Sequence, residues 1–304
     1  MKKIFNIILL ALFCTSFAQA QVGKTFEFTY EGQTLKYVVA DGNEAMVSNQ
    51  KSAKISGDVK VPESVTFEGK KYRVTTIGNA AFWGCSRLTS VTIPNSVSTI
   101  GASAFAYCTG LTSITIPSSV TTIGKWAFYS CDGLSSVTIP NSVTTIDEWA
   151  FGDCTGLTSV TIPNSVTTIG ESAFRSCTGL TSVTIPNSVT TIGKYVFAEC
   201  TGLTSVTIPN SVTTIGGWAF LDCTGLTSVT IPNSVTTIGN AAFWGCFRLT
   251  ILTIENATPP DVEDFAFGVV SGNMTIYVPA ESVEKYKTAE GWSEYADKIK
   301  AIER

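Results

Sequence analysis

The sequence predicts a β-rich solenoid of stacked 23-residue coils that is capped at both ends. One string, LTSVTIPNSVTTIG, begins at Leu157 and returns unchanged at Leu180, Leu203 and Leu226. Cysteines and prolines each recur at a constant step of 23 residues. The cysteines of this series are Cys85, Cys108, Cys131, Cys154, Cys177, Cys200, Cys223 and Cys246. A fixed period of this size is typical of solenoids, whose repeated units stack on one another.

Residues 1–20 have the pattern of a signal peptide. Two lysines precede a mostly apolar stretch, Ile4 to Phe17, which is too short to span a bilayer, and small residues end the segment at Ala20. We therefore expect cleavage after Ala20 and a secreted or cell-surface protein. Lipidation of Cys14 is the alternative, but a phenylalanine precedes it where bacterial lipoproteins carry a small residue. No later segment is apolar enough to predict a transmembrane helix.

Residues 21–73 are expected to form an N-terminal β cap with a divergent first coil. The segments FEFTY and LKYVVA alternate apolar and polar residues, and Glu31-Gly32 between them predicts the turn of a hairpin. The segment VKVPESV is similar to the Ile-Pro-Asn-Ser-Val of the repeat, and the insertion TFEGKKYR follows it. A cap is needed because an open coil would expose a strand edge and apolar core.

The coil that starts at Leu157 illustrates the regular repeats of residues 74–254. Its spacing Leu-x-x-Val-x-Ile predicts a parallel strand, which Pro163-Asn164 ends because proline has no N–H for the ladder. Residues 166–169 predict a second short extended segment, and a glycine then turns the chain. The alanine, phenylalanine and cysteine that follow lie at near-helical spacing, which predicts a short helical turn with one face inward.

This unit resembles the BspA-type leucine-rich repeat, which is common in secreted and surface proteins of bacteria. The resemblance rests on the pattern Leu-Thr-Ser-Val-Thr-Ile-Pro-Asn-Ser-Val-Thr-Thr-Ile-Gly-x-x-Ala-Phe-x-x-Cys and covers residues 74–254. It implies a leucine-rich repeat solenoid, and adhesion to host proteins or to other cells. The chain departs from the best-known leucine-rich repeats, because Pro-Asn-Ser-Val replaces the Asn-x-Leu after the strand. No asparagine ladder is therefore expected.

Residues 255–304 are expected to form drifted last coils and a C-terminal helical cap. The segments DFAFGVV and TIYVPAESV are imperfect copies of the repeat, and Val270 lies near the cysteine position. Residues 280–287 and the segment WSEYADKIKAIE are charged, rich in helix formers and mixed with aromatic residues. This ending resembles the terminal segment of the same family.

The repeated cysteines have two explanations. An even number of cysteines in an exported protein fits a chain of disulfides. However, coils in register place neighbouring Cβ atoms about 4.8 Å apart, and a disulfide normally spans about 3.5–4.5 Å. We therefore expect a buried ladder of free thiols. One cysteine per coil in a single row also gives no tetrahedral zinc cluster.

The positions that differ most between the copies are the candidates for ligand contact. After the Ile-Gly turn they hold Trp126, Trp149, Tyr195 and Trp218, with Ser172 interrupting the row. Before the cysteine they hold Trp83, Tyr107, Tyr129 and Trp244. If these side chains face solvent, they form an aromatic ridge that suits a protein or glycan ligand. The alternative is that the rings stack on one another and shield this edge of the coils.

Composition argues against several classes of function. The chain has no histidine, which removes Ser–His–Asp and Cys–His catalysis and histidine metal sites, and its net charge of -4 gives no nucleic-acid footprint. Carboxylates such as Glu148 and Glu171 lie on different coils, with no pair flanking a pocket. The sequence also lacks a phosphate-binding glycine loop and a calcium loop. We therefore expect no enzyme activity, no cofactor and no metal.

The expected function is that of an exported, non-enzymatic binding protein. Its extended repeat surface would contact a macromolecular ligand, a protein or a glycan, in adhesion, with host matrix proteins among the candidates. A self-associating structural spacer of the cell envelope is the alternative. Ice binding is the third hypothesis, because Thr158, Ser159 and Thr161 and their copies would form hydroxyl ladders. Such residues also simply suit an exposed strand.

Overall fold

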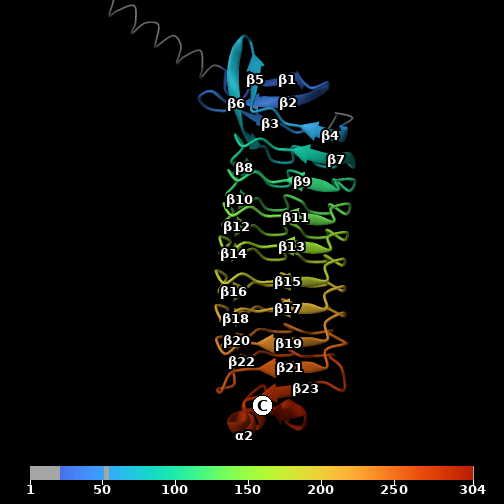
Figure 1. The fold of residues 1–304 in the computed structure, drawn as a ribbon, viewed down its shortest axis with the longest axis vertical. Coiled ribbons are helices and arrows are strands. Elements are labelled where there is room, and N and C mark those ends of the chain that lie inside the picture. Colours follow the sequence, from blue (N-terminus) through green and yellow to red (C-terminus); the bar gives the residue numbers. More distant parts are fainter. Residues whose placement is uncertain (1–20, 51–54, 304) are drawn as a thin grey trace, which may run out of the picture.

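The computed structural model describes residues 21–50 and 55–303. The predicted signal peptide, its cleavage after Ala20 and the alternative of a lipidated Cys14 lie outside the described residues. The described chain is an elongated β-solenoid, with hairpins at its N-terminal end and short helices at its C-terminal end (Figure 1). Val137 pairs with Val160, which confirms that coils with a 23-residue period stack in register.

Each coil places one strand on the first of two ladders. Its strands are β7 (Arg87–Thr92), β9 (Ser113–Thr115), β11 (Ser136–Thr138), β13 (Ser159–Thr161), β15 (Ser182–Thr184), β17 (Ser205–Thr207), β19 (Ser228–Ile231), β21 (Ile251–Ile254) and β23 (Thr275–Val278). Side chains alternate along each strand, so that in β11 Val137 is buried while Ser136 and Thr138 are exposed. This ladder is the parallel strand that the Leu-x-x-Val-x-Ile spacing predicts.

A second ladder of two-residue strands follows the Pro-Asn turns. Its strands are β8 (Thr99–Ile100), β10 (Thr122–Ile123), β12 (Thr145–Ile146), β14 (Thr168–Ile169), β16 (Thr191–Ile192), β18 (Thr214–Ile215), β20 (Thr237–Ile238) and β22 (Asp261–Val262). In each regular coil the isoleucine points into the core and the threonine points outward. The second extended segment of the repeat is thus present, although it is only two residues long.

The third segment of each coil is a run of tight turns and not the helical turn that its spacing predicts. Ser172 and Ser176 both have φ of 58°, in the left-handed region, which a right-handed helix does not contain. Their N–H groups leave the coil and donate to the carbonyls of Lys194 and Ala198 in the next coil, at 3.1 and 2.8 Å. The alanine, phenylalanine and cysteine of this segment are nevertheless buried, as expected of its inward face.

The core is a stack of equivalent side chains. Phenylalanine rings of consecutive coils lie nearly parallel, with centroids between 5.1 and 5.6 Å apart. The rings are Phe82, Phe105, Phe128, Phe151, Phe174, Phe197, Phe220, Phe243 and Phe267. The repeated cysteines are buried, free thiols. Cys177 donates to the carbonyl oxygen of Phe151 at 3.1 Å, and the same bond recurs in the neighbouring coils.

Antiparallel hairpins form the N-terminal end of the described chain. Strands β1 (Thr25–Tyr30), β2 (Gln33–Val39), β3 (Glu44–Val47), β4 (Ser56–Lys60), β5 (Ser64–Phe67) and β6 (Lys70–Ile77) make up this region. The β1–β2 turn has φ of 47° at Glu31 and 80° at Gly32, as a two-residue hairpin requires. Strand β2 also pairs antiparallel with β3, and the insertion TFEGKKYR forms the hairpin β5–β6. Strands β3 and β4 pair in parallel with β6 and β7.

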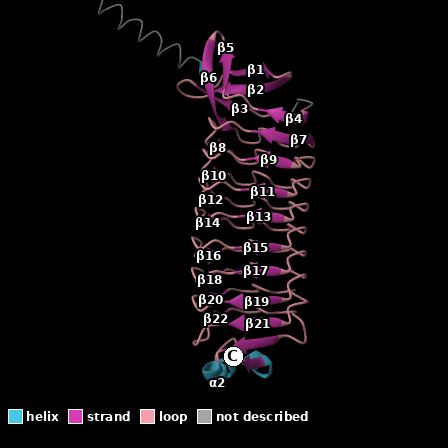
Figure 2. Ribbon diagram, in the orientation of Figure 1, coloured by secondary structure: helices cyan, strands magenta, loops and turns pink. Residues whose placement is uncertain are grey.

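Helices gather at the C-terminal end of the described chain (Figure 2). The elements here are η1 (Ala280–Ser282), α2 (Val283–Thr288), η2 (Ser293–Lys298) and β24 (Ile299–Ala301). Trp292 is fully buried against the last phenylalanine of the stack, and its Nε1 donates to the Pro260 carbonyl at 2.8 Å. None of the helices in the described part of the chain has the length and apolarity needed to cross a membrane.

Candidate ligand-binding surface

Aromatic side chains line the edge of the solenoid formed by the tight turns. We call this set the aromatic strip, and its members are Trp83, Tyr107, Trp126, Tyr129, Trp149, Arg175, Tyr195, Trp218, Trp244 and Phe265. Trp126, Trp149, Tyr195 and Trp218 have φ between 55° and 59°. Ala241 occupies the same position with φ of 51°, so the coil itself imposes this conformation. A non-glycine residue in this left-handed conformation costs about 1–2 kcal/mol. Since alanine occupies the position as well as tryptophan does, the fold does not require a large ring there.

The rings of the N-terminal half of the strip form one contact cluster. Trp83 lies 5.6 Å from Tyr107, and Tyr107 lies 5.3 Å from Tyr129. Tyr129 in turn lies 5.5 Å from Trp126 and 5.7 Å from Trp149. Trp83, Tyr107 and Trp126 are still 44%, 40% and 38% exposed. The sequence offered two alternatives, a ridge that faces solvent and rings that stack on one another. Both apply here, because the rings contact one another and are also exposed to solvent.

Arg175 fills the interruption at Ser172. The small Ser172 side chain is buried, and the Arg175 guanidinium lies 5.3 Å from the Trp149 ring and 5.3 Å from the Tyr195 ring. Arg175 also forms an ion pair with Glu199 at 2.5 Å. Sequence reasoning missed this role, because the contacts of Arg175 reach across two coils. The available signal was an arginine two residues before the cysteine of the coil in which Ser172 interrupts the row of Trp126, Trp149, Tyr195 and Trp218.

A cavity of about 470 Å³ opens in the C-terminal half of the strip. It lies where the small Ala241 separates Trp218 from Phe265, and its lining residues are Arg175, Tyr195, Trp218, Leu221, Asn240, Ala241, Trp244 and Phe265. Tyr195 and Trp218 stack with an interplanar angle of 6° beside it. Phe265 is 67% exposed. The sequence analysis did not include Phe265, because its coil is a drifted copy with one extra residue.

Polar groups beside the strip connect neighbouring coils. The Tyr129 hydroxyl donates to the Asp153 carboxylate, and this bond raises the pKa of Tyr129 above its usual value. Lys125 pairs with Glu148 across one coil junction at 2.6 Å. Over residues 21–50 and 55–303, no group of three or more His, Cys, Asp or Glu side chains is placed to hold a metal ion.

The threonine ladders have a structural use. The Thr158 hydroxyl donates to the Ser135 carbonyl of the preceding coil at 3.0 Å, and the Thr204 hydroxyl donates to the Thr181 carbonyl at 3.0 Å. The hydroxyl groups of the Thr158 series therefore tie neighbouring coils together at the edge of the first ladder. This contact accounts for the recurrence of that one series without a ligand.

Comparisons with known proteins agree with this architecture. The profile of the BspA type leucine rich repeat region matches residues 75–204 and 190–289, with six copies. A crystal structure of a leucine-rich repeat protein from Bacteroides ovatus ATCC 8483 is 27% identical, has a TM-score of 0.63, and covers 92% of this chain and 76% of its own. The T. pallidum leucine rich repeat protein is 28% identical, has a TM-score of 0.57, and covers 71% of this chain and 87% of its own. No curated protein matches the chain.

The family match spans well over half of the sequence and coincides with the stacked coils. Such repeats form scaffolds that bind other proteins, and the proteins that carry them are typically non-enzymatic. The chain belongs to the BspA type leucine rich repeat family.

Proposed function

We propose that this protein is exported, remains at or near the cell surface, and binds a macromolecular ligand through the aromatic strip in adhesion. The ligand we favour is another protein, with matrix proteins of a host as the first candidates. One observation carries the proposal: a row of partly exposed Trp, Tyr, Phe and Arg side chains follows one edge of a rigid stack of coils. Membership of the BspA-type family supports both the binding and the export.

The physical properties of the strip suit protein recognition. Trp, Tyr and Arg supply much of the binding energy at protein interfaces, because each buries a large area at a small entropic cost. Ring contacts between neighbouring coils already hold these side chains in place, so little freedom remains to be lost on binding. The cavity beside Trp218 adds a recess for one apolar side chain of the partner.

Two features disfavour the alternatives. End-to-end assembly of a spacer needs an open coil edge, but the β1–β2 hairpin covers the first coils and η2 with β24 covers the last. Ice binding needs free hydroxyl groups in a regular lattice, but the hydroxyls of one of the three series, that of Thr158, donate to backbone carbonyls. Both observations favour a ligand contact at the strip over self-assembly or ice binding.

The test is binding of the purified protein to arrayed extracellular-matrix proteins and glycans. A strip variant carries Trp126→Ala, Trp149→Ala and Trp218→Ala. A matched control carries three alanine substitutions on the exposed side of the first ladder, at Thr115, Thr138 and Thr161. Circular dichroism establishes that both variants are folded.

We expect binding to a protein on the array that the strip variant loses and the control keeps. Binding that survives in the strip variant would remove the aromatic strip as the site. Selective binding to glycans would keep the strip and overturn the protein ligand. An absence of binding, together with concentration-dependent assembly in sedimentation, would favour the spacer.

A further inference from the structure

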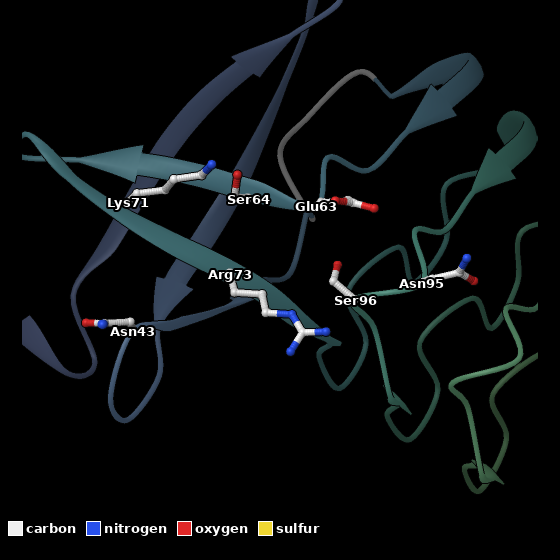
Figure 3. Close-up of a pocket in the computed structure, with 7 residues that line it drawn as sticks. All are labelled: Asn43, Glu63, Ser64, Lys71, Arg73, Asn95 and Ser96. Atoms are coloured by element: carbon white, nitrogen blue, oxygen red, sulfur yellow. The ribbon is translucent and has the colours of Figure 1, made fainter.

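A second cavity, of about 490 Å³, lies at the N-terminal cap and shares no residue with the aromatic strip. Seven polar residues line it: Asn43, Glu63, Ser64, Lys71, Arg73, Asn95 and Ser96 (Figure 3). This composition contrasts with the cavity beside Trp218, whose walls are mainly aromatic and aliphatic. The cavity therefore suits a small polar ligand.

The hairpin insertion and the first regular coil build this cavity together. Arg73 lies on β6 directly opposite Ser64 of β5, and Lys71 precedes Arg73 by two residues, on the same face of the strand. The carbonyl of Asn43 accepts the Arg73 N–H at 2.7 Å, which fixes the start of β3 beside β6. The Pro-Asn turn after β7 supplies Ser96, and the Arg73 guanidinium points toward it (Figure 3).

The polar side chains that line the cavity have no partners among the residues that the structure describes. None of the seven forms a side-chain hydrogen bond or an ion pair with another described residue. Glu44, the register partner of Arg73, instead accepts a hydrogen bond from the Thr75 hydroxyl at 3.1 Å. Lys71 and Arg73 carry two positive charges and Glu63 one negative charge, so the lining has a net charge of about +1 at neutral pH.

Ser96 brings a buried hydroxyl without a partner to this cavity. In later coils the equivalent serine donates to a valine carbonyl of the preceding coil, as Ser142 does to Val120 at 2.6 Å and Ser211 does to Val189 at 2.7 Å, except at Ser165, whose hydroxyl also has no partner. Ser96 is 8% exposed, and its hydroxyl has no hydrogen-bond partner. A buried hydroxyl without a partner costs about 1–3 kcal/mol. A ligand that accepts a hydrogen bond from the Ser96 hydroxyl would recover this energy.

We propose that this cavity binds the carboxylate of an acidic sugar. The planar guanidinium of Arg73 matches a carboxylate through two parallel hydrogen bonds, and Lys71 adds a second cation. The lining charge matches a monoanionic group better than a dianionic phosphate. Asn43, Asn95, Ser64 and Glu63 offer donors and acceptors to the hydroxyl groups of a sugar ring. A volume of about 490 Å³ accommodates a small ligand, since such sites span about 300–1,000 Å³.

The test is calorimetric titration of the purified protein with glucuronate, glucose and acetate. We expect glucuronate to bind at least about tenfold more tightly than either glucose, which lacks the carboxylate, or acetate, which lacks the ring. Arg73→Gln should weaken glucuronate binding by about tenfold or more, and Ser96→Ala by about threefold. Arg248→Gln, which removes an exposed arginine of a regular coil, should leave it unchanged.

Each other outcome overturns the proposal in a defined way. Equal binding of glucose and glucuronate would show that the carboxylate is not recognised. Equal binding of acetate would exclude the sugar ring. Binding that Arg73→Gln leaves intact, or no binding of glucuronate at all, would remove this cavity as the site. The aromatic strip is untouched by these variants, so failure here is separate from failure of the proposed adhesion.

Discussion

The junction between coil 157–179 and coil 180–202 differs from the junctions on either side of it. At every other junction between regular coils in the described chain, at least one of the two strand ladders is continuous. Here β13 does not pair with β15 and β14 does not pair with β16, an interruption that can be followed in Figure 1. We call this junction the seam. It occurs although the two coils have almost the same sequence.

Distances and burial confirm that the coils are farther apart at the seam. Ile169 is 8% exposed, whereas Ile146 and Ile215 are fully buried. A methyl group placed on Gly193 would lie 3.6 Å from the Ile169 carbonyl oxygen, but at Gly124 the corresponding distance to the preceding coil is 2.7 Å. At the seam the two coils are therefore separated along the second ladder.

Val196 is the residue that distinguishes the seam. Every regular coil carries alanine before the core phenylalanine, except coil 180–202, which carries Val196. The same methyl group on Gly193 would lie 3.4 Å from Cγ2 of Val196, so the larger side chain occupies the space under the turn. Added carbon atoms in a close-packed core force the backbone to move. The comparison associates the loss of both ladders at one junction with the larger core side chain of Val196.

The opposite edge of the seam remains closed. Phe174 and Val196 share a backbone hydrogen bond at 3.0 Å, and the rings of Phe174 and Phe197 stay stacked at 5.6 Å. Arg175 spans the same junction through Tyr195 and Glu199. The seam is thus open along the strands and held along the aromatic strip.

The largest expected effect on the free energy of unfolding is that of alkaline pH. The row of buried thiols continues on both sides of the seam, so every regular coil contributes to this effect. Burial raises the pKa of Cys154 and Cys200 to about 12. Thiols of the unfolded chain have a pKa of about 8.5. Above that pH the unfolded state therefore loses protons that the folded state keeps. Each such thiol lowers the free energy of unfolding by about 1.4 kcal/mol per pH unit. Stability should be full below about pH 8 and fall by several kcal/mol by about pH 10, measured by urea denaturation.

Two controls belong to this experiment. Replacing Cys177 and Cys200 with alanine should make the decline with pH less steep. Thiol alkylation at neutral pH should be equally slow at Cys177, Cys200 and Cys223. Faster alkylation at the two seam cysteines would mean that the seam opens through the whole coil, and an unchanged stability at pH 10 would contradict the buried thiol ladder.

The next largest effect is expected when a core phenylalanine ring is removed, either at the seam or away from it. Phe128→Ala should lower the free energy of unfolding by about 3–5 kcal/mol, because its ring is stacked between two others at 5.3 and 5.2 Å. Phe174→Ala should lie toward the lower end of that range, since a coil with interrupted ladders collapses more easily around a cavity. Urea denaturation of the two variants measures the difference. A larger loss for Phe174→Ala would contradict the looser packing of the seam.

A smaller effect is expected from moving the seam. Ala150→Val should lower the free energy of unfolding by about 1–3 kcal/mol and open a second seam two coils closer to the N-terminus. The Asp147 N–H, which donates to the Ile123 carbonyl at 3.0 Å, should then exchange with deuterium faster. Val196→Ala should slow the exchange of the Gly193 N–H by restoring its bond to the preceding coil. Unchanged exchange at Gly193 would show that Val196 is not the cause of the seam.

The smallest effect is expected at the closed edge of the seam. Arg175→Gln should lower the free energy of unfolding by about 1 kcal/mol, since it removes a partly exposed ion pair and two ring contacts. Lys125→Gln is the matched control at a regular junction and should cause a smaller loss, because the Lys125–Glu148 pair is more exposed. Equal losses of stability for the two variants in thermal unfolding would mean that the contacts of Arg175 do not specifically stabilise the seam.

The sequence analysis predicted the coil but not all of the candidate site. Variation between copies identified Trp126, Trp149 and Trp218, because a repeat makes every departure from its pattern visible. It did not identify Arg175 and Phe265 as members of the same strip. Arg175 belongs to the strip because its guanidinium contacts rings on two other coils. Phe265 belongs to it although one extra residue in its coil shifts its position in the repeat. Contacts of this kind follow from the stacking distance and not from the composition of any one coil.

The sequence by itself determined the period, the register and the inward face of the coils. Each apolar position recurs every 23 residues, so stacking in register is the arrangement that buries all of them at once. Only the tertiary structure decided the backbone of the tight turns, the exposure of the strip and the position of the seam. The alternate N–H groups of the turns bond to the next coil, and Val196 lies beside Gly193 at the junction with the preceding one. These features depend on how two coils share the space between them, which no single coil specifies.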